Sequence, residues 1–240
     1  MNDIEKTNLY NDGQYLENNP TWHTEDSPWK ALQILKLLDK NNIKPKTISE
    51  IGCGAGEILN NLYNEMEEDI TFCGYEVSED AYQICKNKEK ARLNFQLKDF
   101  LTESDKHYDA LLLIDIVEHI DDYIGFLKQV KNKGKYKVFN VPLEIFALKA
   151  LFGHYYLESR EKYGHIHYFN KDIFLAVLED AGYKVLDWHY GNSVLELAGI
   201  SKSISLKSRM LHIPRRILNK INVDFSAKLL GGYSLFVLVE

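Results

Sequence analysis

The stretch Thr47-Ile-Ser-Glu-Ile51-Gly52-Cys53-Gly54-Ala55-Gly56-Glu57 decides the fold of this chain. Its first five residues predict a buried strand, its three glycines a tight turn, and the residues after Gly56 a helix. Glycines are needed at such a turn because a side chain there would keep a ligand away from the backbone. The stretch therefore predicts a strand, a turn that binds a nucleotide-like ligand, and a helix.

The same alternation of strand and helix continues along the chain on both sides of this turn. Pro28 at the first helical position, with Ser27 as N-cap, predicts a helix before the first strand. Further strands are expected at residues 70–77, 94–97, 108–114, 135–141, 183–190 and 232–240, and helices at 29–38, 57–67, 78–87, 118–133 and 170–181. Strands that alternate with helices predict an α/β fold, with a parallel sheet covered by helices on both faces.

Two segments interrupt this rhythm, at residues 143–167 and 193–231. Loops this long in a compact domain are usually functional, and these two follow strands whose carboxyl ends form the ligand-binding edge of an open sheet. We expect one domain over residues 1–240, with an N-terminal cap (1–45), a cofactor-binding half (46–142) and a substrate-binding half (143–240) that carries both segments as lids. Tyrosines 155, 156 and 163 of the first lid are expected to line the acceptor pocket.

Composition limits the classes of function. A net charge of −6 gives no general attraction to nucleic acid, so we expect a small-molecule substrate. Three cysteines without paired spacing and a polar, acidic N-terminus indicate a reduced, cytoplasmic compartment. No apolar run approaches the ~20 residues that a membrane span needs.

An acidic residue follows the glycine turn at the distance expected of a nucleotide site. Glu76 ends the second strand 20 residues after Gly56, where a carboxylate reaches ribose hydroxyls. A dinucleotide site has the motif G-x-G-x-x-G, but here the third glycine, Gly56, comes one position earlier. Glu57 at the start of the helix would also repel a pyrophosphate. Glu50 instead suits a ligand that carries an ammonium or sulfonium group. The alternative is a plain tight connection followed by a solvated strand end.

These residues resemble the first motifs of class I S-adenosylmethionine-dependent methyltransferases. Later stretches at 98–100, 115–119 and 164–169 extend the resemblance, toward the subgroup that contains quinone-biosynthesis and sugar or natural-product methyltransferases. The resemblance implies a Rossmann-like seven-stranded sheet with an antiparallel last strand, and S-adenosylmethionine as cofactor. It implies cofactor contacts for Glu50, Gly52, Cys53, Gly54, Gly56, Glu76, Val77, Asp99, Phe100 and Asp115. Asp99 taken alone is more typical of a helix or turn cap, and the resemblance makes the cofactor contact equally compatible.

Three histidines are candidates for a general base. Methyl transfer to an unactivated hydroxyl requires removal of its proton, and the pKa of histidine lies near neutral pH. His165 ranks first because it follows Gly164 in the family-like motif, His167 lies on the same side of an extended segment, and His119 lies near the expected sulfonium. These imidazoles could instead tie the loop to the sheet, and an acidic acceptor needs no base.

Other features leave alternatives open. Asp115, Glu118 and His119 could form a magnesium site, although we favour capping and wall-lining roles and expect no metal. Trp22 and Trp29 suggest either a cap over the site or simple anchoring. Lys30 could neutralise the carboxylate of the cofactor, although we expect a surface lysine. The basic, amphipathic segment 206–221 is compatible with peripheral membrane contact or with a packed surface helix.

The sequence therefore predicts transfer of a methyl group to a small molecule, most plausibly to a hydroxyl of a surface-glycan, quinone or secondary-metabolite precursor. Oxygen is preferred over nitrogen as the methyl acceptor only because members of the resembled family commonly methylate oxygen. A non-catalytic S-adenosylmethionine-binding protein and a dinucleotide-dependent redox enzyme are the alternatives. Oligomeric state is left open.

Overall fold

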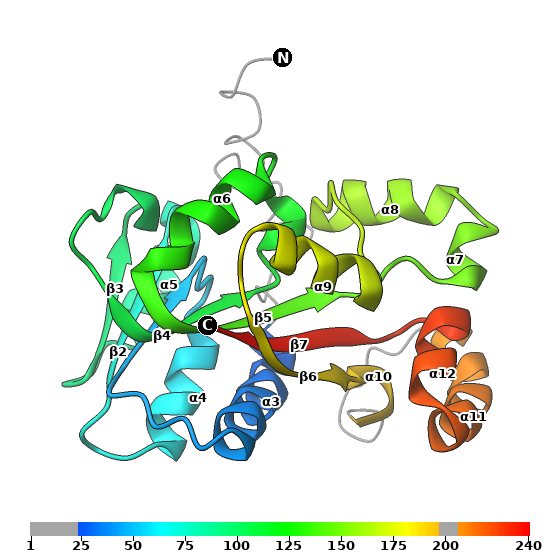
Figure 1. Ribbon diagram of the computed structural model, residues 1–240, viewed down its shortest axis with the longest axis horizontal. Coiled ribbons are helices and arrows are strands. Elements are labelled where there is room, and N and C mark those ends of the chain that lie inside the picture. Colours follow the sequence, from blue (N-terminus) through cyan, green and yellow to red (C-terminus); the bar gives the residue numbers. More distant parts are fainter. Residues whose placement is uncertain (1–23, 197–205) are drawn as a thin grey trace.

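The computed structural model describes residues 24–196 and 206–240. Seven strands form one sheet in the order β3-β2-β1-β4-β5-β7-β6 (Figure 1). The strands are β1 (Thr47–Ile51), β2 (Thr71–Glu76), β3 (Leu93–Leu97), β4 (Tyr108–Ile114), β5 (Gly134–Pro142), β6 (Val185–Gly191) and β7 (Ser234–Val239). Neighbouring strands pair in parallel except for β7, which runs antiparallel to both β5 and β6. The predicted fold class is confirmed.

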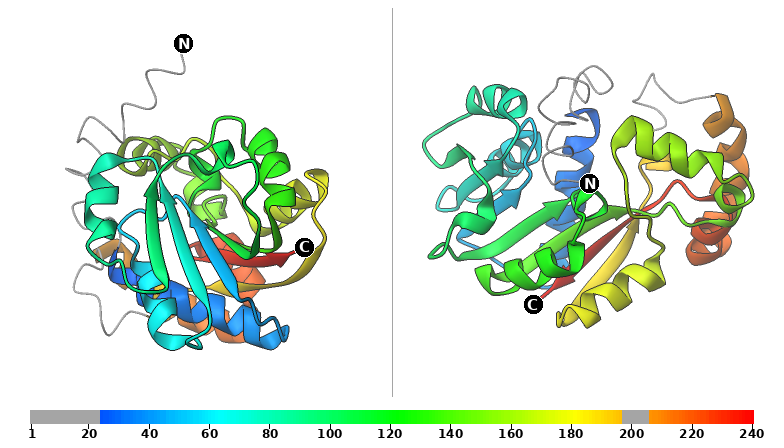
Figure 2. Two further views of the ribbon diagram at one scale, coloured as in Figure 1. Left: turned by 90° about the vertical axis from the view of Figure 1, so that its left-hand side faces the viewer. Right: turned by 90° about the horizontal axis from the view of Figure 1, so that it is seen from above.

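Helices cover both faces of the sheet (Figures 1 and 2). On one face, α3 (Ser27–Lys40), α4 (Glu57–Glu65) and α5 (Glu79–Lys86) contribute apolar residues to a shared core with β1–β4. On the other, α6 (Tyr123–Val130) and α9 (Lys171–Asp180) pack with β4, β5 and β7 in a second core. Both cores are made of side chains that alternate inward along the strands, which fixes the register of the sheet.

Two predicted helix starts are wrong in detail. The helix expected at 118–133 is divided into short 3₁₀ turns, Val117–His119 and Lys131–Lys133, around α6. The division arises because the Asp122 carboxylate accepts a bond from Gly125 N and starts a new helix, while the carbonyl of Glu118 accepts from Ile166 N and His167 N. Helix α3 takes Asp26 rather than Ser27 as its N-cap residue.

The two expected lids are largely helical. The first contains α7 (Ala147–Ala150) and α8 (His154–Tyr163), and the second contains α10 (Ser193–Glu196), α11 (Leu206–Ile221) and α12 (Val223–Leu230). In Figure 1, α7 and α8 lie above α11 and α12 at one end of the molecule. Residues 1–23 of the expected cap, with Trp22, and residues 197–205 of the second lid lie outside the described residues. Two further 3₁₀ turns are Thr24–Asp26 and Phe100–Thr102.

Candidate active site

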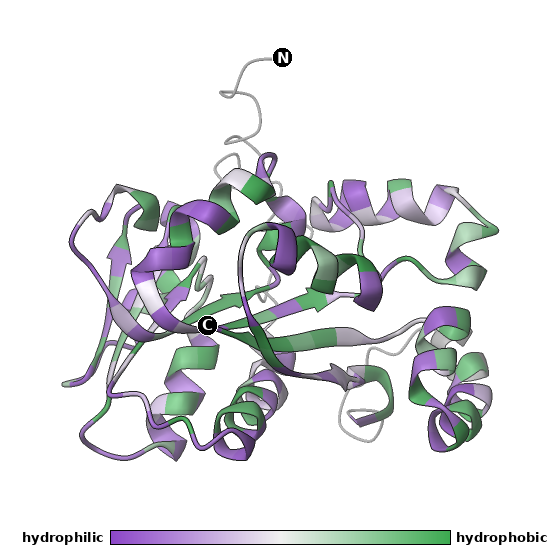
Figure 3. Cartoon of the chain, in the orientation of Figure 1, coloured by the Kyte–Doolittle hydropathy of each residue, from purple (hydrophilic) through white to green (hydrophobic). Residues whose placement is uncertain are grey.

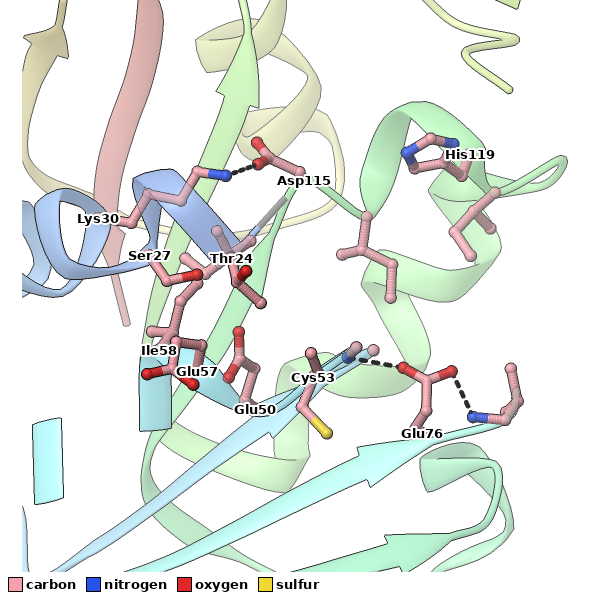
Figure 4. A pocket seen from close by; sticks show the side chains of 17 residues that line it. Thr24, Ser27, Lys30, Glu50, Cys53, Glu57, Ile58, Glu76, Asp115 and His119 are labelled. Atoms are coloured by element: carbon pink, nitrogen blue, oxygen red, sulfur yellow. Dashed lines mark hydrogen bonds and ion pairs between the residues drawn. The ribbon is translucent and has the colours of Figure 1, made fainter. Parts of the chain in front are cut away.

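A cavity of about 250 Å³ opens at the carboxyl ends of β1, β2 and β4 (Figure 4). Its walls are the glycine turn, the start of α3 and the segment after β4. Seven of the ten predicted cofactor-binding residues line it: Glu50, Gly52, Cys53, Gly54, Glu76, Val77 and Asp115. The structure therefore brings together residues that come from three separate strands.

The glycine turn has the backbone conformation that requires glycine. Gly52, Gly54 and Gly56 have φ angles of 69°, 51° and 74°, in the left-handed region. The N–H groups of Gly52 and Cys53 both donate to the carbonyl of Tyr75, which ties the turn to β2. Gly56 does not line a cavity, but a Cβ at this position would lie 2.6 Å from the Phe95 ring. Its role in the structure is close packing against β3.

Glu76 is held in place by backbone N–H groups. Its carboxylate accepts from Gly54 N at 2.7 Å, and from Val77 N and Ser78 N at 2.8 Å each. Burial raises the pKa of Glu76, and these three donors oppose that shift. The carboxylate thus joins the glycine turn to the end of β2. Oε1 accepts from both Val77 N and Ser78 N, whereas Oε2 accepts only from Gly54 N and keeps a lone-pair site for a further donor.

Glu50 is a buried carboxylate at the floor of the cavity (Figure 4). The residue is 2% exposed, and among the described residues its Oε2 has no hydrogen-bond partner. Burial raises its pKa well above the usual range, although Lys30 opposes the shift. A buried oxygen without a donor is costly, and a cationic ligand in the cavity would relieve that cost.

Lys30 is not the surface lysine that we expected. It is 8% exposed, and its Nζ lies 2.6 Å from Oδ2 of Asp115 and 2.9 Å from Oδ2 of Asp26. Burial lowers the pKa of Lys30, but these two carboxylates outweigh burial and raise it. Asp115 also accepts from Nδ2 of Asn140 at 2.6 Å and has a left-handed φ of 50°. Strain of this kind is typical of functional positions.

A second cavity of about 410 Å³ adjoins the first, and Gly52, Val77 and Ile116 line both. Asp99 and Phe100 line the second cavity as well. Asp99 also caps the following 3₁₀ turn, accepting from Leu101 N at 2.8 Å. The cap is therefore confirmed, and the cofactor contact of Asp99 stays a prediction. Phe100 is 1% exposed and packs edge-on against Tyr75, so it supports this cavity from the core.

A third cavity of about 340 Å³ lies on the opposite side of the first, and Lys30, Asp115 and His119 line both. His119 and His165 both line it, and their rings pack edge-on against each other with centroids 5.0 Å apart. His119 Nδ1 lies 3.2 Å from the carbonyl oxygen of Gly164. Two of the three predicted catalytic histidines therefore meet beside the cofactor cavity.

Glu144 is the site residue that the sequence did not reveal. Its Oε2 lies 2.7 Å from Nδ1 of His165, and its Oε1 binds Lys149 Nζ and accepts from Ser159 Oγ at 2.7 Å. Burial raises the pKa of Glu144, but His165 and Lys149 outweigh it and hold the pKa at about 2. The carboxylate is therefore ionised at neutral pH and orients the His165 ring.

His167 lies apart from this pair. Its Nε2 is 3.2 Å from the carbonyl oxygen of Asp121, and its ring packs edge-on against Tyr123 with centroids 4.6 Å apart. His167 lines none of these three cavities, and it does not line the fourth cavity, which is described next. These contacts tie the loop to the start of α6 rather than to the sheet.

The fourth cavity, of about 620 Å³, extends the third between the two lids. Tyr163, Val194 and Tyr233 line both, and most of the remaining lining is apolar or aromatic, including Phe146 and Leu211. Tyr155 lines it as well, whereas Tyr156 packs against the Tyr168 ring. The four cavities thus form a continuous series along the carboxyl ends of the strands.

Three side chains at this site lie close enough together to hold a metal ion, and they differ from the set Asp115, Glu118 and His119 that the sequence suggested. Glu118, His119 and His165 each bring a ligand atom within 4.8 Å of the others. Within the described part of the chain, both oxygens of Glu118 are buried without a hydrogen-bond partner. Burial and the nearby Asp115 raise the pKa of Glu118. Asp115 itself is occupied by Lys30 and Asn140.

Comparison with known proteins agrees with this site. Residues 22–187 match the model of a family described as a methyltransferase domain, and the chain belongs to that family. This class of enzyme takes the methyl group from S-adenosylmethionine, as the sequence predicted. Among curated proteins, the ubiquinone biosynthesis O-methyltransferase of Rickettsia bellii is 26% identical over 100 residues. That match covers 39% of this chain and 41% of the relative.

Solved structures share the fold. The plantazolicin methyltransferase BpumL, solved in complex with SAH, superposes with a TM-score of 0.63 at 16% identity, covering 98% of this chain and 93% of that one. A SAM-dependent methyltransferase from Archaeoglobus fulgidus gives a TM-score of 0.55 at 21% identity, with 87% and 93% covered. Of the helices that the structure describes, none combines the length and the apolar character that a membrane crossing requires.

Proposed function

We propose that this protein transfers a methyl group from S-adenosylmethionine to a hydroxyl oxygen of a small-molecule acceptor, a precursor of a surface glycan, a quinone or a secondary metabolite. Family membership supports the reaction class, and the name of the curated relative supports oxygen as the methyl acceptor. The observation that carries the proposal is the Glu144–His165 pair. His165 lines the third cavity, which adjoins the first, and Glu144 lines the fourth.

The residues of the first two cavities fit the cofactor. Its ribose hydroxyls would donate to Glu76, its adenine amine to Asp99, and its ammonium group would lie near the unpartnered oxygen of Glu50. The carboxyl group of the methionine part would interact with the buried Lys30. When bound, the cofactor supplies an electrophilic methyl group on a positively charged sulfur.

The residues of the third cavity would activate the acceptor. Because the Glu144 carboxylate is an acceptor only, Nδ1 of His165 carries the proton that joins them. When the ring is neutral, its free lone pair is on Nε2, where it can take the proton of an acceptor hydroxyl. The displacement is in line, so the acceptor oxygen must be aligned with the methyl carbon and the sulfur. The larger, apolar fourth cavity would hold the remainder of the acceptor.

Calorimetry with S-adenosylmethionine and a turnover screen would test this function. We expect binding in solution, and release of S-adenosylhomocysteine with phenols, sugars or other hydroxyl compounds as acceptors. Binding without turnover across the screen would favour a non-catalytic protein. Turnover restricted to amines would overturn the assignment to oxygen.

Limited proteolysis would test the proposed place of the acceptor. We expect the cofactor product and an acceptor together to protect cleavage sites in residues 143–167 and 193–231 more than the cofactor product alone does. If the acceptor protects only cleavage sites within residues 46–142, it binds outside the two lids.

A further inference from the structure

Exposed apolar side chains are concentrated on the two lids. Of the thirteen large apolar residues that are exposed in the described part of the chain, eight lie on these lids: Leu151, Phe152, Leu157, Ile213, Ile217, Ile221, Val223 and Phe225. Such a concentration at one end of a molecule indicates an interaction surface rather than scattered surface residues.

Helix α11 carries the clearest part of this surface. Ile213, Ile217 and Ile221 are spaced four residues apart, so they form one row along the helix, and they are 69%, 55% and 75% exposed. Figure 3 shows hydrophobic residues alternating with polar ones along α11. Three isoleucines exposed in a row leave the helix with an apolar face that the described domain does not cover.

The orientation of this row is fixed by the opposite face of α11. The Arg215 side chain is buried, with Nε 2.8 Å from the carbonyl oxygen of Gly231 and Nη2 3.2 Å from that of Leu230. These bonds tie α11 to the carbonyl end of α12. Leu211, one turn earlier on the same face as Arg215, lines the fourth cavity. The isoleucine row therefore faces outward because the other face is anchored, and α11 does not need to rotate to expose it.

The charge of α11 differs from that of the chain as a whole. The chain has a net charge of −6, whereas residues 206–221 contain five lysines and arginines and no acidic residue. Arg216 and Lys220 are exposed and follow Ile213 and Ile217 by three residues, so they border the isoleucine row. An apolar row bordered by cations is the pattern of a helix that lies in the interface of an anionic bilayer.

A second copy of the chain fits this face less well. Symmetric packing of α11 on its copy would bring the same basic residues of both chains close together, and like charges repel. An anionic surface complements both the isoleucines and the cations.

We propose that α11 docks this protein on an anionic lipid surface, with Ile213, Ile217 and Ile221 inserted among the lipid chains and with Arg216 and Lys220 at the headgroups. The same helix lines the fourth cavity, so docking places that cavity next to the bilayer. The proposal concerns a surface and does not depend on which acceptor is methylated.

Co-sedimentation of the full chain with vesicles would test the docking. We expect binding to phosphatidylcholine vesicles that contain 30–40% phosphatidylglycerol (roughly the charge density of an anionic membrane), weaker binding to phosphatidylcholine alone, and weakening with added salt. Ile217→Glu should lower the affinity about ten- to a hundred-fold, because an inserted aliphatic side chain is replaced by an anion. The double variant Arg216→Gln/Lys220→Gln should lower it about thirtyfold, at roughly fivefold for each charge.

Leu32→Glu provides the matched control. Leu32 is 51% exposed on α3, which lies apart from α11 in Figure 1, so this variant should bind vesicles as the original chain does. Unchanged calorimetric binding of S-adenosylmethionine by Ile217→Glu would show that the fold is intact. Equal binding to neutral and anionic vesicles, equal losses in Leu32→Glu and Ile217→Glu, or a dimer by light scattering that Ile217→Glu dissociates would each overturn the proposal.

Discussion

Nδ1 of His165 lies 2.7 Å from Oε2 of Glu144, across a lid of two helices. The same carboxylate binds the buried Lys149, so both of its oxygens are engaged and its position is fixed. A histidine whose ring is oriented in this way has a defined tautomer. The arrangement can serve proton removal from an acceptor, and it also ties the start of the first lid, at Glu144, to its end, at His165.

Replacement of the histidine tests the role of the base. His165→Gln should lower turnover about 10²–10⁴-fold, the usual contribution of a general base, while S-adenosylmethionine affinity stays within twofold (about 0.4 kcal/mol). The measurement is turnover against calorimetric affinity in the same preparation. His107→Gln, at an exposed position before β4, is the control. Full turnover of His165→Gln would remove His165 as the base and leave His119, whereas a variant that does not fold would indicate a purely structural role.

Glu144 should make stability depend on acid pH. Its pKa is held at about 2 in the folded chain against an ordinary value of 4.5, so the ionised form stabilises the fold. A depression of this size corresponds to about 3 kcal/mol. That contribution is fully present above about pH 5 and is lost as the pH falls from 4.5 toward 2.

Thermal unfolding of Glu144→Gln between pH 7 and pH 3 would check this dependence. We expect the variant to unfold about 6–12 °C lower at pH 7, and the difference to shrink below pH 4.5. The loss at pH 7 includes the cost of leaving Lys149 buried without its carboxylate. A difference that stays constant down to pH 3 would contradict the prediction.

Removal of the Glu76 carboxylate should weaken cofactor binding. Glu76→Ala loses the acceptor for the ribose hydroxyls, and each hydrogen bond to a charged group contributes about 1.5–3 kcal/mol, so the affinity should fall about ten- to a hundred-fold. The variant also removes the hydrogen bond that Gly54 N donates to Glu76, so a melting curve must show that the variant is folded before its calorimetric affinity is compared. Glu79→Ala, at an exposed position on α5, should bind as the original chain does. If a folded Glu76→Ala binds S-adenosylmethionine normally, the cofactor lies elsewhere.

Residues close together in sequence, or in fixed register with a strand, could be predicted. The glycine turn and Glu76 belong to two adjacent parallel strands, and both follow directly from the strand ends. Burial patterns along β1 and β4 are those of central strands, and these strands were placed to the residue. Local propensity and alternation determine such elements, so sequence is sufficient for them.

The burial of Lys30 and the role of Glu144 could not be predicted. Lys30 is buried because α3 lies across the carboxyl end of β4, which brings Asp115 to it from 85 residues further along the chain. Glu144 and His165 are 21 residues apart, and only the course of α7 and α8 brings them together. The break before α6 depends on the carbonyl of Glu118 bonding to the segment at 166–167. Each of these features depends on tertiary contacts.

The pair formed by Lys30 and Asp115 should be required for both stability and cofactor binding. Lys30→Met keeps the length and apolar stem of the side chain but leaves Asp115 and Asp26 without their cation, and breaking a buried pair costs about 3–5 kcal/mol. The pKa of Lys30 is raised by its partners, so its contribution is fully present at all pH values below its ordinary pKa of 10.5 and is lost only as the pH rises through the raised value.

The melting temperature and the S-adenosylmethionine affinity of Lys30→Met should therefore both fall, to a similar extent at pH 6 and at pH 9. Lys36→Met, an exposed position on the same helix, controls for the change of side chain. A loss of affinity with an unchanged melting temperature would mean that Lys30 contacts the cofactor without supporting the fold. A variant that matches Lys36→Met in both measurements would show that the buried pair contributes to neither, because its desolvation then offsets its attraction.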